Sequence, residues 1–171
     1  MLIQKSSLLK IAMATAMLTL LTGCPFDDDD NDDSPDVVVT PTPEPPAPAP
    51  EYSYEIQVTN LTYAQPLSPI AVTLHGDEVL WTIGMPASNA LEILAEGGDN
   101  SSFIGQESII ASASGEGVVM PGTMSTISVT TTEMTATHIT IATMLVNTND
   151  AFSGLTGLDL SSFELDDSRS W

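Results

Sequence analysis

The chain has 171 residues and one cysteine, and its 23 Asp or Glu against 3 Lys or Arg give a formal net charge of −20 at pH 7. A surface this acidic repels phosphate backbones, which excludes nucleic acid as a partner. One cysteine excludes an internal disulfide bond, and about 120 residues remain for a single domain after the N-terminal segments.

The first 23 residues have the pattern of a leader that is cleaved from an exported protein. Lys5 and Lys10 precede an apolar run over 11–21, and Leu21-Thr22-Gly23-Cys24 closes it. The run fits a leader's apolar core of roughly 7–15 residues and is shorter than the about 20 residues of a membrane-spanning helix. Its last four residues resemble the lipobox of bacterial lipoproteins, which implies cleavage before Cys24 and lipidation of its thiol. An ordinary secretory leader and a transmembrane anchor are the alternatives.

The lipid on Cys24 is expected to be what holds the protein on a membrane. All the acidic residues follow Cys24 and only Arg169 opposes them, so the cleaved chain carries 1 − 23 = −22 before its terminal groups. Such a chain repels anionic head groups, whereas each buried acyl methylene contributes about 0.8 kcal/mol. Pro25 follows Cys24, where an Asp favours inner-membrane retention in the lipoproteins that this leader resembles. We therefore expect anchoring in the outer membrane of a Gram-negative bacterium.

Residues 24–50 are predicted to form a disordered tether between the lipid and the domain. Residues 25–36 are an acidic block that repels itself, and they lack the glycine and ligand spacing of an EF-hand loop. Residues 40–50 are proline-rich and favour extended polyproline II. A spacer that holds the domain off the membrane is the main interpretation, and a proline-rich ligand for an adaptor is the alternative.

Residues 51–171 predict one mainly β domain. In the first predicted strand, 52–60, a period of two places Tyr52, Tyr54, Ile56 and Val58 on one face. Alternating or short apolar runs predict further strands at 70–75, 79–83, 123–131 and 138–146. The last of these is apolar on both faces, so we expect it to be central in its sheet.

One helix is predicted over 86–96, with Ser88 as its N-cap and Gly97-Gly98 as its end. Residues 99–117 are polar and rich in Gly and Ser, with an apolar patch at Ile109-Ile110, and no element is predicted there. Several short strands with one short helix indicate an antiparallel β-sandwich.

Catalytic signatures are absent from the sequence, so we do not expect an enzyme. The two histidines, His75 and His138, stand at predicted strand ends. Zinc takes three or four protein ligands, and no cysteine is free to supply one. We therefore interpret both histidines as partly buried surface residues rather than as ligands.

The end of the predicted central strand is the most informative stretch. Asn147, Asn149 and Asp150 form a polar turn, followed by Phe152 and by Gly154, which is expected to permit a sharp turn. Calcium takes six to eight oxygen ligands, and short oxygen-bearing side chains supply them. The same residues also form turns without any metal, and the spacing leaves both interpretations open.

Five segments resemble the bacterial branch of the spondin N-terminal domain family, in the order of that family. They are Val58-Thr-Asn-Leu-Thr62, Gln65-Pro-Leu-Ser-Pro69, Gly84-Met-Pro-Ala-Ser88, Leu94-Ala-Glu-Gly-Gly-Asp99 and Met144-Leu-Val-Asn-Thr-Asn-Asp-Ala-Phe-Ser-Gly154. The resemblance covers about residues 51–171 and implies a C2-like β-sandwich. It also implies a calcium site at one end of the sandwich, with Asp150 in the position of a metal-binding Asp and Asn149 beside it. Ala151 stands where the animal proteins have Trp.

Members of that family continue past the segment that matches Ser168–Trp171, with a further strand and an acidic loop. The resemblance therefore implies that the domain is incomplete at its C-terminus and that Asp150 lacks partner ligands. Taken together, the sequence predicts a lipid-anchored module for adhesion or for binding a protein or matrix ligand. A structural envelope lipoprotein with no specific ligand is the alternative.

Overall fold

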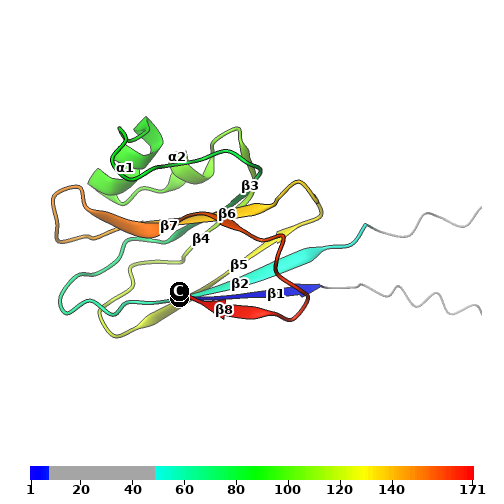
Figure 1. The fold of residues 1–171 in the computed structure, drawn as a ribbon. Helices are drawn as coiled ribbons and strands as arrows, with labels where there is room; N and C mark the ends of the chain where they lie inside the picture. The colour runs from blue at the N-terminus through cyan, green and yellow to red at the C-terminus, as the bar shows by residue number, and fades with distance from the viewer. Residues whose placement is uncertain (8–48) are drawn as a thin grey trace, which may run out of the picture. The chain divides into compact units, whose positions relative to one another are not determined.

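The computed structural model describes residues 1–7 and 49–171, which form two four-stranded antiparallel sheets (Figure 1). The prediction of a mainly β sandwich is confirmed. The sheet orders are β5-β2-β1-β8 and β4-β3-β6-β7. The elements, in chain order, are β1 (Leu2–Ser7), β2 (Tyr52–Thr59), β3 (Ala71–His75), α1 (Asn89–Gly97), α2 (Ser101–Ile104), β4 (Ile109–Ser114), β5 (Met124–Thr131), β6 (His138–Met144), β7 (Phe152–Asp159) and β8 (Ser168–Ser170).

The main core lies between the two sheets, where the inward faces of their strands meet. Period-two alternation supplies these faces, since successive side chains of a strand point to opposite sides. On β2, Tyr54 and Ile56 are buried, as predicted, and on β6 the inward residues are Ile139 and Ile141. The buried members of this core are Ile3, Tyr54, Ile56, Leu67, Ile70, Val72, Leu74, Val119, Ile127, Val129, Ala136, Ile139, Ile141, Leu160 and Phe163.

A second core lies between the helices and the outer face of the β4-β3-β6-β7 sheet, which they cover in Figure 1. The predicted helix is confirmed, although it begins at Asn89 rather than at residue 86. Ser88 is extended and its hydroxyl accepts a hydrogen bond from Leu91 N, which fixes that start. Gly98, at φ 70°, ends the helix. The buried residues of this core are Ala71, Leu80, Leu91, Leu94, Phe103, Ala142 and Met144.

Four of the five predicted strands are confirmed as β2, β3, β5 and β6. The last is central, since β6 pairs with both β3 and β7. Its two apolar faces have different neighbours, because Ile139 and Ile141 face the other sheet while Ala142 and Met144 face the helices. This double burial explains why the segment lacks a polar face.

The predicted strand at 79–83 is wrong. Those residues form a loop and a turn, in which Leu80 is buried and Trp81 packs edge-to-face on Phe152 with 5.2 Å between ring centroids. Ile83 at the far end is exposed. Only the middle of the run, Leu80 and Trp81, therefore packs on the second core, and it does so from a loop without a strand ladder.

Residues 99–117, for which the sequence predicts no element, contain α2 and β4. β4 (Ile109–Ser114) pairs with β3, and beyond its two isoleucines it consists of Ala and Ser only. Such small residues give almost no alternating apolar signal, and the strand forms because the edge of β3 is open to it. The prediction of a sharp turn at Gly154 is also wrong, because Gly154 lies inside β7.

Met1–Ser7, assigned to the leader from the sequence, contribute β1 to the sandwich and belong to the same compact unit as the domain. The lipidation residue Cys24 and almost all of the predicted tether, 24–50, lie outside the described residues.

Candidate functional site

β1 fills a slot between β2 and β8. It pairs antiparallel with β2 over six residue pairs, from Leu2–Gln57 to Ser7–Tyr52. On its other side it pairs antiparallel with β8 over three, from Leu2–Ser170 to Gln4–Ser168. β8 pairs with no other strand among the described residues. β1 is thus what links β8 to the sheet.

The inward residues of β1 are Ile3 and Lys5, and Met1, directly before the strand, lies on the same face. Ile3 is 0% exposed and belongs to the main core, and Met1 packs against that core. An isoleucine enclosed in this way stabilises the fold by roughly 1.5–3 kcal/mol relative to an exposed one. The slot therefore receives a large apolar side chain at its middle.

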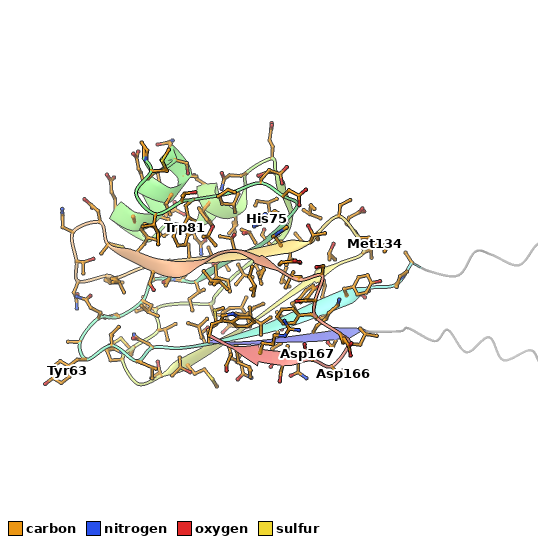
Figure 2. All side chains as sticks on the ribbon, viewed as in Figure 1. Tyr63, His75, Trp81, Met134, Asp166 and Asp167 are labelled. Carbon is orange, nitrogen blue, oxygen red and sulfur yellow. The ribbon has the colours of Figure 1, made fainter. Side chains whose placement is uncertain are left out.

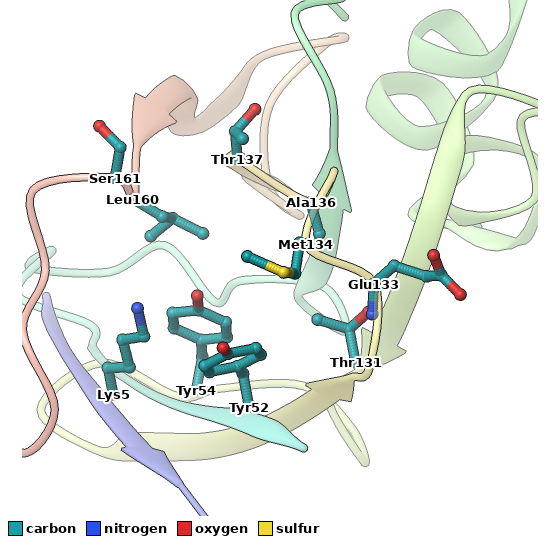
Figure 3. Close-up of a pocket in the computed structure, with 10 residues that line it drawn as sticks. All are labelled: Lys5, Tyr52, Tyr54, Thr131, Glu133, Met134, Ala136, Thr137, Leu160 and Ser161. Atoms are coloured by element: carbon teal, nitrogen blue, oxygen red, sulfur yellow. The ribbon is translucent and has the colours of Figure 1, made fainter. Parts of the chain in front are cut away.

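Lys5 enters a pocket lined by aromatic rings at one end of the slot (Figure 3). Its ammonium lies 5.2 Å from the ring centroid of Tyr52 and 5.9 Å from that of Tyr54, both within cation–π range. It also donates a hydrogen bond of 3.2 Å to the Phe163 carbonyl. Burial, and to a smaller extent the neighbouring Tyr52, raises the pKa of Tyr54. The raised pKa keeps the Tyr54 ring neutral at physiological pH, and both rings present their faces to the Lys5 ammonium.

The other end of the slot is closed by the C-terminal segment. The Met1 ammonium donates to the Trp171 carbonyl at 2.9 Å, and Trp171 N donates to the Met1 carbonyl at 3.0 Å. The Trp171 ring stacks on Phe163 at 5.9 Å, and the Arg169 guanidinium lies 4.5 Å from the Phe163 ring. Phe163, which is buried, anchors this segment to the core.

Two hollows flank β1 along the slot. The first, of about 200 Å³, is lined by Lys5, Tyr52, Tyr54 and neighbouring loop residues. The second, of about 500 Å³, includes Met1 and Trp171 in its wall, together with the apolar ends of β2, β6 and β7. Ile3 lies between Met1 and Lys5 on the same face. The N-terminal segment therefore reaches both hollows, through Met1 at one end and Lys5 at the other.

The candidate metal residues lie elsewhere, in the turn between β6 and β7. Asn149 and Asp150 are exposed there, and Asp150 has a φ of 62°. A hollow of about 270 Å³ beside the turn is lined by Asp150 and by Glu92 and Glu96 of α1. Within residues 1–7 and 49–171, no three His, Cys, Asp or Glu side chains form a group that can hold a metal ion. Spacing along the chain did not indicate that these glutamates face the turn.

The other predicted turn residues hold the loop together. The backbone N–H of Asn147 donates to the Gln65 side chain, and the side-chain amide of Asn147 donates to the Ala64 carbonyl. Thr148 accepts a hydrogen bond from Ala151 N and donates one to the Leu145 carbonyl. The turn interpretation thus accounts for Asn147 and Thr148, and the calcium prediction rests on Asn149 and Asp150.

His75 and His138 face each other across the β3–β6 ladder, with ring centroids 6.0 Å apart. The strand-end prediction is confirmed for both, but His75 is 0% exposed and is therefore a core residue rather than a surface one. Its Nδ1 donates to the Gly76 carbonyl at 3.0 Å, which leaves Nε2 to accept from the Thr140 hydroxyl at 2.8 Å. Figure 2 places His75 and Trp81 on the side of the helices, and Asp166 and Asp167 beside the other sheet.

We expect the free energy of unfolding to fall as the pH drops below about 6.5, the ordinary histidine value, because of His75. Burial lowers the pKa of His75; the Gly76 carbonyl and Glu78 oppose this, and His138 adds to it. Below 6.5 the unfolded chain then binds more protons than the folded chain, until the pH reaches the lowered value. Denaturant titrations between pH 7.5 and about 5 measure the slope.

A His75→Gln variant is expected to lose most of this pH dependence of the unfolding free energy. His138→Gln is expected to keep it, because burial of His75 is the largest cause of its lowered pKa. Asp77 and Asp159 are the other charged groups beside this pair. Equal slopes in the wild type and His75→Gln contradict the assignment.

No protein-family model matches the chain, and no curated protein matches it. In the part of the chain that the structure describes, neither helix is long and apolar enough to cross a membrane.

Proposed function

We propose that this chain is the precursor of an exported lipoprotein, cut before Cys24 and anchored in the outer membrane, which presents an acidic β-sandwich as a non-enzymatic binding module. The order of Lys5, Lys10, the apolar run 11–21 and Leu21-Thr22-Gly23-Cys24 carries the proposal. The lipid provides the membrane contact that the acidic chain does not.

Three features of the domain support a role in binding a protein or matrix component. The sandwich follows the predicted tether directly, since β2 begins at Tyr52. Two hollows along β1 are lined mostly by apolar and aromatic side chains. The histidine His75 is 0% exposed, so a substrate does not reach it as a general base, which favours binding over catalysis. The spondin-like resemblance and an adhesive function belong to the same proposal.

The proposal requires Met1–Ser7 to leave the sheet, because a cleaved leader is no part of the mature protein. A leader inserted in the export machinery cannot pair with β2 at the same time. The packing of Ile3 and Lys5 in the slot favours the opposite outcome, in which these residues stay as a strand of an uncut chain. One experiment separates the two.

The experiment expresses the full chain in a Gram-negative host that is fed labelled palmitate. We expect label on the protein, recovery in the outer-membrane fraction, and a mass that shows loss of residues 1–23. Cys24→Ser is expected to abolish the label because serine offers no thiol for the transfer, while Pro25→Ala keeps it. A protein that retains Met1 and carries no label would refute the proposal.

Calcium binding at the Asp150 turn stays a prediction. Calcium in hundredfold excess over its Kd is expected to stabilise the folded protein by about 2.7 kcal/mol and raise its Tm accordingly. Asp150→Ala is expected to abolish this shift, and Glu92→Gln to reduce it, since Glu92 lines the same hollow. Asp99→Ala, at an exposed turn before α2, is the control that keeps the shift. Equal shifts in the wild type and Asp150→Ala contradict the prediction.

A further inference from the structure

Cleavage before Cys24 opens the sheet at its middle. This step rests on the proposed function, because only a processed chain loses β1. The loss exposes the edge of β2 over the six residues Tyr52–Gln57, whose ladder partners are Leu2–Ser7. It also removes Lys5 from the wall of one hollow and Met1 from the wall of the other. A strand edge flanked by hollows with apolar and aromatic walls is the geometry of strand addition.

β8 is poorly suited to close this gap. β1 runs antiparallel to both neighbours, so β8 is parallel to β2 and does not match the antiparallel ladder that β1 leaves. β8 has three residues against the six on β2. Closing the gap also requires a lateral shift of about 4.8 Å, one strand spacing. Phe163, buried in the core, and the hydrogen bonds from Arg169 to Ser162 oppose that shift.

The side chains that β1 places in the slot indicate which residues a bound segment needs. Its middle takes an apolar residue, as shown by the full burial of Ile3. Two residues further on, the slot takes a cation, which lies over Tyr52 and Tyr54 and donates to the Phe163 carbonyl. The outward position between them, Gln4, is exposed and therefore unselective.

Net charge favours another protein over a second copy of the same chain. The processed chain carries 1 − 23 = −22 from its side chains, so two copies repel each other. It contains no Lys after residue 10, and its one Arg is Arg169 of β8. A second copy therefore offers only the three-residue β8, whose Arg169 is bonded to Asp167 and Ser162, whereas a cationic partner is attracted over a distance.

We infer that the mature protein binds an extended, cationic segment of another protein chain in the slot between β2 and β8. The segment adds antiparallel to β2, with an apolar residue in the Ile3 position and Lys or Arg in the Lys5 position. Backbone hydrogen bonds to β2 give the register, and the two inward positions give the selectivity.

The test uses the full chain with Cys24→Ser and a protease site introduced between residues 10 and 23. After cleavage the N-terminal fragment is removed, and the probe is a synthetic peptide with the sequence of Met1–Ser7. Hydrogen exchange should show the alternate amides of Tyr52–Gln57 that face β1, rather than those that face β5, losing protection on removal of the fragment and regaining it with the peptide. Where the cut chain unfolds, peptide-dependent refolding is the readout in place of protection.

Peptide variants separate strand addition from non-specific binding. Ile3→Asp and Lys5→Glu peptides are expected to bind at least about tenfold more weakly, and Gln4→Ala is expected to bind within about twofold of the parent. Three results overturn the inference: amides on the β1 side of β2 that stay protected with the slot empty, equal binding of the Ile3→Asp peptide, or a dimer that protects those amides without peptide. The palmitate experiment is independent of the peptide experiment. If the peptide binds in the slot but the chain takes up no palmitate, the result contradicts the proposed function and leaves the slot inference standing.

Discussion

Gly154→Ala is expected to unfold the domain or to destabilise it by more than about 4 kcal/mol, the range of exceptional substitutions. A Cβ at Gly154 collides with the backbone carbonyl of Ile141 on the neighbouring strand. Backbone atoms at the centre of a sheet cannot move away as a flexible side chain does. The β6–β7 register shifts between Ile139 and Ile141, next to this close approach. Thermal and urea unfolding of the full chain measure the loss.

Gly117→Ala is the matched control. Nothing lies within 4 Å of a Cβ at Gly117, and its backbone needs no positive φ. We expect a change within about 0.5 kcal/mol there, as for other unconstrained surface positions. A Gly154→Ala protein as stable as the Gly117→Ala protein contradicts the close approach of β6 and β7.

Asn60→Ala is expected to cost about 3 kcal/mol, the sum of several lost hydrogen bonds at a buried site. Asn60 is 1% exposed. Its amide donates to the carbonyls of Gln65 and Val119 at 2.8 Å each, and its Oδ1 accepts from the Thr62 backbone and hydroxyl. Removal of this side chain takes the acceptor from Thr62 N and one donor from each carbonyl, although Thr62 Oγ1 still donates to Gln65 O and Leu67 N still donates to Val119 O. Denaturant unfolding at a fixed pH gives the value.

Asn147→Ala is the control for Asn60→Ala. Asn147 contacts the same loop, through the Ala64 carbonyl, but its side chain is exposed. Water replaces its lost bond, so we expect a change within about 0.5 kcal/mol. Similar losses in the two variants mean that Asn60 is not the organising residue of this loop. Asn60 and Gly154 both line the 500 Å³ hollow, so the two substitutions also show how far the stability of the domain depends on residues in the wall of that hollow.

The confirmed predictions depended on signals carried by single segments. Alternation in 52–60 identified β2, two apolar faces in 138–146 identified a central strand, and Ser88 with Gly98 bounded a helix. Each signal reflects an interaction within the segment or burial of a whole face. The error at 79–83 has the same origin, because the apolar residues there pack from a loop, Trp81 on Phe152, without joining a sheet.

The residues that sequence reasoning missed are those defined by a neighbour far along the chain. Asn60 reads as an ordinary turn residue until Val119 is placed beside it. Gly154 reads as a turn glycine until the Ile141 carbonyl is placed against it. Glu92 reads as a solvent-exposed helix residue until Asp150 is placed across its hollow. In each case the partner is not readable from local pattern.

By itself the sequence determined the β class, the helix boundaries to within a few residues, the acidic surface and the leader-like pattern that ends at Cys24. Composition and periodicity suffice for these because they depend on local chemistry alone. Only the tertiary structure decided that Met1–Ser7 match a slot beside β2, with Ile3 in the core and Lys5 over two tyrosines. Strand pairing between residues some fifty positions apart depends on which edges the folded sheet leaves open, and that is a property of the assembled sandwich.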